Sequence, residues 1–287
     1  MIIERVPLYQ VDAFTTVAFR GNPAAVCLLP MPLADPLLQT IAAEMNLSET
    51  AFLLRTNHRC WRSGDTFSLR WFTPQTEVPL CGHATLATAA VLFEITRVSA
   101  TEVTFQTMSG DLLARKRDDG IALDFPTDPP VPCKPPSGIL GALGLSVDMV
   151  VASCYGAKTH KLLLHLADTQ LVSELCPDYQ ALLAVETMAA YRGLIVTAAG
   201  AGDGDYDFIS RFFAPWIGIN EDPVTGSAHT VLGPYWTAQL GKSELRAYQA
   251  SARGGELGVR LLEGGRVELV GQAAMVFEGC LTLPEVA

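Results

Sequence analysis

The sequence predicts an α+β protein built from two pseudo-equivalent domains, each with a sheet rolled around a central helix. Three observations support this fold class. Similar segments occur in the same order in the two halves, each half has an alanine-rich helical segment that begins at a glycine, and a proline-rich stretch lies between the halves. The order of the matches indicates internal duplication. The predicted domains are residues 1–128 and 129–287, with the last strand able to pack against the first domain.

Length and composition exclude several classes of protein. The chain has 287 residues, enough for two domains with full cores, and is 49% hydrophobic and 17% charged. No apolar run approaches the roughly 20 residues that span a bilayer, so we expect no membrane partner. A formal net charge of -10 repels nucleic-acid phosphates, and the short basic cluster ARKR at 114–117 fits the edge of a hairpin. We therefore expect no nucleic-acid partner.

The start of the chain and its cysteines indicate where the protein works. MIIERVPLYQVDAF mixes charged residues with β-formers, which predicts a first strand and not a cleavable signal. Seven cysteines without C-x-x-C spacing predict reduced thiols in a reducing compartment. We expect a cytoplasmic protein.

Three elements of the first half matter for function. DPLLQTIAAEM at 35–45 has helical spacing and should end near Asn46. ETAFLL then alternates like a strand, which places Glu49 at a helix-to-strand turn beside apolar neighbours. GHATLATAAVLFE at 82–94 has the composition of a buried central helix.

The middle of the chain contains the predicted linker. Six of the eighteen prolines fall between Pro126 and Pro136, within FPTDPPVPCKPPSG. Because each proline removes a backbone donor and fixes φ, we expect this stretch to continue neither a sheet nor a helix. Farther on, RGLIVTA and DFISRFF predict strands on either side of a glycine- and aspartate-rich loop at 198–208.

Three matched pairs of segments carry the duplication, and the spacing between copies changes little along the chain. They are RWFTP at 70–74 with RFFAP at 211–215, EVPLCGHA at 77–84 with EDPVTGSA at 221–228, and GDLLAR at 110–115 with GELGVR at 255–260. The second central helix, SAHTVLGPYWTAQL, is the counterpart of the first.

Both central helices are predicted to begin at a glycine, Gly82 or Gly226. Such a helix start offers unpaired N–H groups and the positive end of the dipole, and glycine lets a ligand approach the backbone. The alternative is an ordinary cap in which Ser227 or Asp222 satisfies those N–H groups. Different polar neighbours in the two copies, His83 opposite Ser227, favour one asymmetric site that binds a small carboxylate between the halves.

Longer segments resemble a known family. They are FRGNPAAVCLL at 19–29, MNLSETAFLL at 45–54, LRWFTPQTEVPLCGHATLATA at 69–89, EDPVTGSAH at 221–229 and RGGELGVRLLEGGRVELVGQAAMVFEG at 253–279. Over nearly its whole length the chain resembles the phenazine-biosynthesis isomerase-like (PhzF-like) family, and most of all its vertebrate-type members. The resemblance implies the diaminopimelate epimerase fold and, commonly, a homodimer.

The resemblance also implies a set of site residues. Glu49 stands where the family carries its acid–base glutamate, while His83, Asp222 and Ser227 stand at substrate-binding positions and Gly82 and Gly226 present backbone N–H groups. Taken alone, each has another interpretation: a solvated or capping glutamate, a core histidine, a turn aspartate and a capping serine. A partly desolvated carboxyl group has a raised pKa and can both accept and return a proton.

Cys81 marks a departure from related racemases. In diaminopimelate epimerases a cysteine precedes each helix-start glycine, whereas this sequence has Cys81 before Gly82 but Thr225 before Gly226. A threonine hydroxyl is no thiolate base near neutral pH, so the two-thiol mechanism is lost. We favour a packing role for Cys81.

These observations predict a cofactor-independent isomerase that moves a proton on a small carboxylate-bearing substrate by means of Glu49. Cys81 and His83 lie two residues apart without a second ligand pair, and no glycine fingerprint for a dinucleotide follows a strand, so we expect no metal and no cofactor. Two alternatives stay open. One is a one-base racemase or epimerase that uses Cys81 with Glu49, and the other is a catalytically silent binding or regulatory protein on the same fold.

Overall fold

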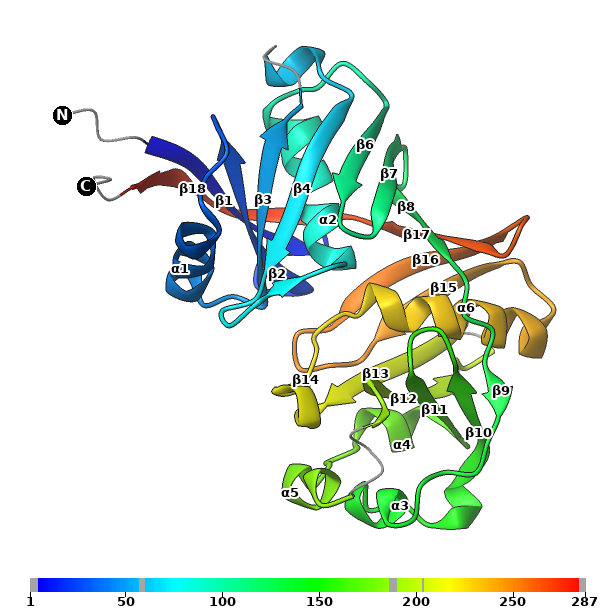
Figure 1. The fold of residues 1–287 in the computed structure, drawn as a ribbon. Coiled ribbons are helices and arrows are strands. Elements are labelled where there is room, and N and C mark those ends of the chain that lie inside the picture. Colours follow the sequence, from blue (N-terminus) through cyan, green and yellow to red (C-terminus); the bar gives the residue numbers. More distant parts are fainter. Residues whose placement is uncertain (1–4, 57–59, 186–189, 203, 284–287) are drawn as a thin grey trace. The chain divides into compact units, whose positions relative to one another are not determined.

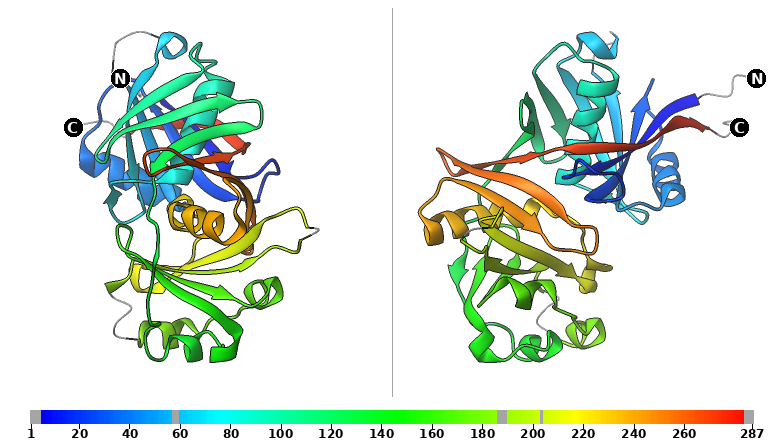
Figure 2. Two further views of the ribbon diagram at one scale, coloured as in Figure 1. Left: turned by 90° about the vertical axis from the view of Figure 1, so that its right-hand side faces the viewer. Right: turned by 180° about the vertical axis from the view of Figure 1, so that it is seen from behind.

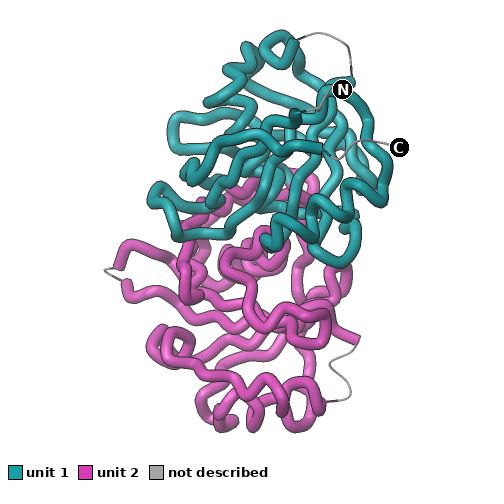
Figure 3. Tube along the Cα trace, turned by 90° about the vertical axis from the view of Figure 1, so that its left-hand side faces the viewer, with its two compact units in different colours: residues 1–124, 270–287 teal, residues 125–269 magenta. Residues whose placement is uncertain are grey.

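The computed structural model describes residues 5–56, 60–185, 190–202 and 204–283. The chain divides into two compact units, residues 1–124 with 270–287 and residues 125–269 (Figure 3). The sequence prediction placed the boundary after residue 128. The described residues contain no helix that is both long and apolar enough to cross a membrane.

Unit 1 is a mixed sheet with a buried helix. Its strands pair in the order β18-β1-β2-β3-β4-β6-β7-β8, parallel for β2 with β3 and for β4 with β6 and antiparallel elsewhere. The strands are β1 (Arg5–Ala13), β2 (Asn22–Leu29), β3 (Glu49–Arg55), β4 (Thr66–Phe72), β5 (Glu77–Val78), β6 (Glu102–Thr107), β7 (Gly110–Arg117), β8 (Gly120–Pro126) and β18 (Ala273–Thr282). The helices are α1 (Asp35–Met45), η1 (Trp61–Ser63), and α2 (Gly82–Ala90), which continues as a π-helix over Val91–Ile95.

The strands of unit 1 curve around α2 (Figures 1 and 2). Helix α2 contacts β1, β2, β3 and β7, and every residue from His83 to Ala90 is buried. The small side chains of the alanine-rich segment allow this close packing, because strand backbones can approach such a helix on several sides. The predicted central helix is confirmed.

Helix α1 covers the other face of the sheet. Its apolar residues Leu38 and Ile41 join a core cluster with Phe52 and Phe72. The helix ends where the sequence predicts, because Asn46 adopts the left-handed conformation (φ 48°) that asparagine tolerates. Strand β3 then begins at Glu49, as predicted.

Unit 2 repeats the same order of elements. Its strands pair as β9-β10-β11-β12-β13-β15-β16, parallel for β11 with β12 and for β13 with β15 and antiparallel elsewhere. The strands are β9 (Val131–Pro132), β10 (Val150–Gly156), β11 (Lys161–Leu166), β12 (Gly193–Ala199), β13 (Phe208–Ala214), β14 (Ile219–Glu221), β15 (Glu244–Gln249), β16 (Gly255–Leu262) and β17 (Arg266–Gly271). The helices are α3 (Ile139–Ala142), η3 (Val147–Met149), α4 (Thr169–Ser173), α5 (Tyr179–Leu183), η5 (Pro215–Ile217) and α6 (Gly226–Leu240).

The pairing pattern confirms the predicted duplication. The strand pairs from β2 to β7 are parallel and antiparallel in the same order as the strand pairs from β11 to β16. Helix α6 takes the place of α2 and contacts β15 and β16. Helix α6 has 15 residues and starts at Gly226. Gly241 ends the helix with a left-handed conformation (φ 67°) that suits glycine.

One sequence expectation about the linker is wrong. Val131 and Pro132 form β9, paired with Tyr155 and Cys154 of β10, although the proline-rich stretch was expected to join no sheet. Proline is tolerated there because β9 is an edge strand, where the missing N–H of Pro132 interrupts no ladder between two neighbours. The expected hairpin at 114–117 is confirmed by the pairing of β7 with β8.

Candidate functional site

The N-terminus of α2 carries no side-chain cap. Cys81 occupies the N-cap position in an extended conformation, and no side-chain hydrogen bond closes the helix start there. Thr85 donates its hydroxyl to the Cys81 carbonyl at 2.5 Å, which orients the N-cap residue.

Glu49, His83 and Cys81 form one cluster at this helix start. His83 Nε2 lies 3.2 Å from Glu49 Oε2, and His83 Nδ1 lies 3.5 Å from Cys81 Sγ. The side chains of His83 and Glu49 are only 7% and 15% exposed. The imidazole thus connects the carboxylate at the start of β3 with the thiol that precedes α2.

Nε2 of His83 and Oε2 of Glu49 are close enough for an ion pair, but their geometry is not that of a hydrogen bond. Among the described residues, no atom meets hydrogen-bond geometry at the buried Nε2 of His83. Burial lowers the pKa of His83 to about 3, and an interaction with the backbone carbonyl of Pro23 opposes the shift. The imidazole is therefore neutral at pH 7, with one nitrogen protonated and the other carrying a lone pair.

The N-terminus of α6 is built differently. Thr225 holds the N-cap position, again without a side-chain cap, and donates its hydroxyl to Asp222 Oδ2 at 2.5 Å. Gln249, which is fully buried, accepts from the Thr225 backbone N–H at 2.8 Å and donates to the Asp222 carbonyl at 2.7 Å. Asp222, Thr225 and Gln249 form a rigid polar network beside Gly226.

His229 and Ser227 have distinct surroundings at α6. His229 is completely buried, and its Nδ1 lies 2.9 Å from the Thr225 carbonyl, so Nδ1 donates to it. Burial lowers the pKa of His229 to about 4, with the bond to Thr225 opposing the shift. Ser227 is half-buried, and its backbone carbonyl accepts from Thr230.

A matched arginine–glutamate pair supports each helix start. Arg70 of β4 holds Glu77 with two hydrogen bonds of 2.6 and 2.8 Å, and Arg211 of β13 holds Glu221 with bonds of 2.7 and 3.0 Å. Both glutamates stand at the short strand that leads into the helix. Sequence analysis missed this pair, although the repeated R-[WF]-F and E-x-P motifs contain both partners.

Lys161 is a second residue that sequence analysis missed. It is only 6% exposed at the start of β11, and its ammonium lies 5.9 Å from the ring centre of Phe212. Burial lowers the pKa of Lys161 to about 8, while Asp128 and Asp222 oppose the shift. A lone lysine in KTHK gives no signal in sequence, because only the folded unit buries it and places it in the field of Asp222.

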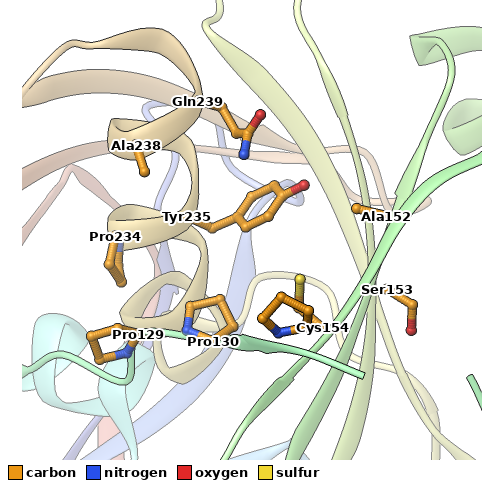
Figure 4. A pocket seen from close by; sticks show the side chains of 10 residues that line it. Pro129, Pro130, Ala152, Ser153, Cys154, Pro234, Tyr235, Ala238 and Gln239 are labelled. Atoms are coloured by element: carbon orange, nitrogen blue, oxygen red, sulfur yellow. The ribbon is translucent and has the colours of Figure 1, made fainter. Parts of the chain in front are cut away.

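Unit 2 also contains a cavity of about 510 Å³ (Figure 4). It lies between α6, β10 and the proline-rich stretch, with Tyr235, Cys154 and Pro130 among its lining residues. Burial raises the pKa of Tyr235 to about 12 and that of Cys154 above its usual value, so neither ionises at neutral pH. None of the predicted site residues lines this cavity, and its chemistry does not support proton transfer.

The predicted site residues therefore fall into two sets. Unit 1 brings together Glu49, Gly82 and His83, with Cys81 as a fourth member. Unit 2 brings together Asp222 and Gly226 with Ser227, and adds Gln249 to them. That one ligand contacts both sets stays a prediction.

Comparisons with known proteins point to one group. The family described as Phenazine biosynthesis-like protein matches residues 11–279. The chain is 52% identical to a Phenazine biosynthesis-like domain-containing protein of Bos taurus, covering 97% of this chain and 99% of the relative. It is 48% identical to an uncharacterized isomerase of Halalkalibacterium halodurans, over 96% and 98% of the two chains.

Solved structures agree with this grouping. A PhzF-family protein of Enterococcus faecalis has a TM-score of 0.88 and 41% identity, with 98% of this chain and all of that chain (100%) covered. A hydroxyproline epimerase of Agrobacterium vitis has a TM-score of 0.57 at 12% identity, over 98% and 93% of the two chains, a likeness of fold alone. The two-domain diaminopimelate epimerase-like fold expected from the sequence is confirmed.

Proposed function

Because the chain belongs to the phenazine biosynthesis-like (PhzF-like) family, whose bacterial members include proteins named isomerases, we propose that it is an isomerase in which Glu49 transfers a proton on a small carboxylate-bearing substrate. The observation that carries the proposal is the placement of Glu49. Its largely buried carboxyl group lies 3.2 Å from His83 and beside an uncapped helix N-terminus.

The surroundings of Glu49 suit a group that accepts and returns a proton. The neighbouring imidazole of His83 is neutral at pH 7, because burial lowers its pKa to about 3, so this ring does not hold the carboxylate ionised by a positive charge. Because Nε2 of the neutral ring lies 3.2 Å from Glu49 Oε2, the ring can stay beside the carboxyl group in either protonation state. His83 thereby positions Glu49 throughout the reaction.

The helix start supplies the electrostatic part of the reaction. Removal of a proton from a carbon next to a carboxylate creates negative charge on the substrate. The first-turn N–H groups at Gly82, together with the positive end of the α2 dipole, stabilise that charge. Glu49 then returns the proton to another atom of the same substrate, and no redox step or group transfer is involved.

The experiment combines isotope exchange with one substitution. Wild-type protein is incubated with a panel of cyclic and amino carboxylic acids in D₂O, and deuterium incorporation at carbon is measured by NMR. Glu49→Gln keeps the size of the side chain but accepts no proton at neutral pH, so turnover should fall by roughly 10² or more while binding of the same compound persists. Glu102→Gln, which changes an exposed carboxylate of β6, is the matched control and should retain wild-type turnover.

The possible outcomes separate the hypotheses. Equal rates for wild type and Glu49→Gln would remove Glu49 from the mechanism. Weaker binding at an unchanged rate would make it a positioning residue. No exchange by wild type across the panel would favour the binding or regulatory alternative.

One observation keeps the thiol alternative open as a second candidate. Cys81 Sγ lies 3.5 Å from His83 Nδ1, a separation at which the imidazole can accept the thiol proton. A one-base racemase or epimerase that uses Cys81 with Glu49 requires this transfer. Its signature is loss of turnover in Cys81→Ala by several orders of magnitude with folding unchanged.

A further inference from the structure

The cluster at the start of α2 contains three different metal-ligating groups. Glu49 offers a carboxylate oxygen, Cys81 a thiol sulfur and His83 a ring nitrogen, and these ligand atoms all lie within 4.8 Å of one another. Cys81 and His83 are buried, and Glu49 is half-buried. Spacing in the sequence gives only the Cys81–His83 pair, whereas the packing of β3 against α2 supplies the third group.

The spacing of the ligand atoms is on the scale of the edges of a metal tetrahedron. With Zn–S near 2.3 Å and Zn–N and Zn–O near 2.0–2.1 Å, tetrahedral ligand atoms lie roughly 3.3–3.6 Å apart. The observed separations are 3.5 Å from sulfur to Nδ1 of His83 and 3.2 Å from Nε2 to the Glu49 oxygen. The two separations are to different nitrogens of the ring, and since one ion takes one of them, the ring must turn for all three side chains to share an ion.

The buried imidazole provides a second, independent indication. His83 is 5% exposed, and its Nε2 points at the carboxylate without hydrogen-bond geometry to any described residue. A buried polar nitrogen without a hydrogen bond lowers the stability of the fold, and coordination to a cation would satisfy that nitrogen.

We propose that Glu49, Cys81 and His83 form a binding site for one thiophilic divalent cation of the Zn²⁺ class. The three side chains supply three ligands, and the fourth position is left for water or an anionic ligand. Binding converts the Cys81 thiol to a thiolate and releases its proton to solvent, so charge and atoms balance. A carboxylate in the coordination shell accepts no proton, and the ion therefore inhibits the isomerase; this consequence rests on the proposed function of Glu49.

The second helix start shows why the site is confined to the first. Thr225 stands where Cys81 stands, and its hydroxyl is already bonded to Asp222 at 2.5 Å. A neutral hydroxyl is a poor ligand for a thiophilic cation. Ser227 stands at the position of His83, so these two matched positions of unit 2 offer neither the sulfur nor the nitrogen.

Direct binding tests the site without reference to activity. Metal-free full-length protein is titrated with Co²⁺, followed by the thiolate-to-cobalt charge-transfer absorption, and Zn²⁺ then displaces the cobalt. We expect one equivalent to bind. Cys81→Ala should abolish the absorption and weaken Zn²⁺ binding by about a hundredfold or more, because losing a ligand costs at least as much as losing one of its outer partners.

Matched variants locate the ion. Cys60→Ala, which removes an exposed cysteine of unit 1, should bind Co²⁺ as wild type does. Glu49→Gln should keep the charge-transfer absorption but weaken binding, since sulfur and nitrogen remain. Circular dichroism of each variant confirms folding. An absent absorption in wild type, or one that survives Cys81→Ala, overturns the proposal.

A turnover measurement separates this proposal from the proposed function. If both hold, Zn²⁺ stops deuterium incorporation at one equivalent and a chelator restores it. If the ion binds as described and the metal-free wild type turns over no substrate, the metal site stands and the isomerase assignment fails. If turnover proceeds and no Co²⁺ binds, the metal site alone fails.

Discussion

The N-termini of α2 and α6 have the same scaffold and carry different chemistry. At each, an Arg–Glu pair holds the strand that leads into the helix, a glycine starts the helix, and no side chain caps it. Unit 1 places a thiol, an imidazole and a carboxylate at that start, whereas unit 2 places a hydroxyl network there.

The difference shows how a duplicated fold divides its tasks. The α2 start contains groups that can exchange a proton or bind a cation. The α6 start contains groups that are already bonded to one another, with Thr225 donating to Asp222 and Gln249 bridging both. The first suits reaction, and the second suits a fixed surface for binding. Substitutions at matched positions test this contrast.

The largest expected effect separates the two Arg–Glu pairs. Arg211 is 10% exposed and also donates to the carbonyl of Leu175 at 2.6 Å, whereas Arg70 is 31% exposed. Removing a buried partner leaves an uncompensated charge and unpaired carbonyls, so Arg211→Gln should lower the free energy of unfolding by about 3 kcal/mol. Arg70→Gln should cost about 1 kcal/mol. Urea unfolding monitored by fluorescence measures both, and equal losses would show that burial does not distinguish the pairs.

The second prediction concerns pH and His229 in α6. Its pKa is about 4 in the folded protein and about 6.5 in the unfolded chain, so the unfolded state binds more protons between these values. Stability is unaffected above the unfolded pKa and falls as pH drops through this window. The contribution should be about 2 kcal/mol between pH 7 and pH 5.

His229→Asn tests this assignment, because the amide can still donate to the Thr225 carbonyl but does not titrate. Its free energy of unfolding should depend less steeply on pH than that of wild type. Identical slopes would mean that His229 is protonated, or exposed, in the folded protein. The measurement is a series of urea titrations at pH 5, 6 and 7.

The two helix starts also show which features of the structure can be predicted from the sequence. Sequence analysis located Gly82 and Gly226 as first residues of their helices, because alanine-rich segments after a glycine are local signals. It placed Glu49 at the beginning of β3 for the same reason: the helix stop at Asn46 and the alternation after it are both local.

Contacts between distant segments could not be predicted from the sequence. Glu49 meets His83 only because β3 pairs with β2 and α2 packs on both strands, and no pattern in either segment encodes that distance. Gln249 reaches Thr225 for the same kind of reason, from the end of β15. The matched R-[WF]-F and E-x-P motifs did contain a readable signal, since charged residues of opposite sign recur together in both copies.

The third prediction tests whether the two helix starts serve one ligand. A methyl group at Gly82 or at Gly226 obstructs approach to the first-turn N–H groups, so each alanine variant should weaken binding of a carboxylate substrate about tenfold, or ~1.4 kcal/mol. Helix propensity favours alanine, so stability should not fall. If one ligand contacts both, each single variant should weaken binding of the same compound, and the double variant should weaken it further. Calorimetric titration of all four proteins measures these losses, and an effect of only one substitution would contradict a shared ligand.

The smallest expected effect is at Cys81, the position at which the two copies differ most. Its side chain is 7% exposed, and removing one sulfur atom leaves a small cavity, so Cys81→Ala should lower the free energy of unfolding by about 1 kcal/mol. If Glu49 alone moves the proton, metal-free Cys81→Ala should keep turnover within about tenfold of wild type, since the carboxylate and its imidazole partner remain.

Thr225→Cys is the reciprocal variant, which places a thiol before Gly226 but gives it Ser227 in place of a histidine. It should gain no turnover, because no imidazole at that position accepts the thiol proton. Solvent exchange and urea unfolding of both variants provide the measurements, and a loss of several orders of magnitude in folded Cys81→Ala would transfer the role of base from Glu49 to the thiol.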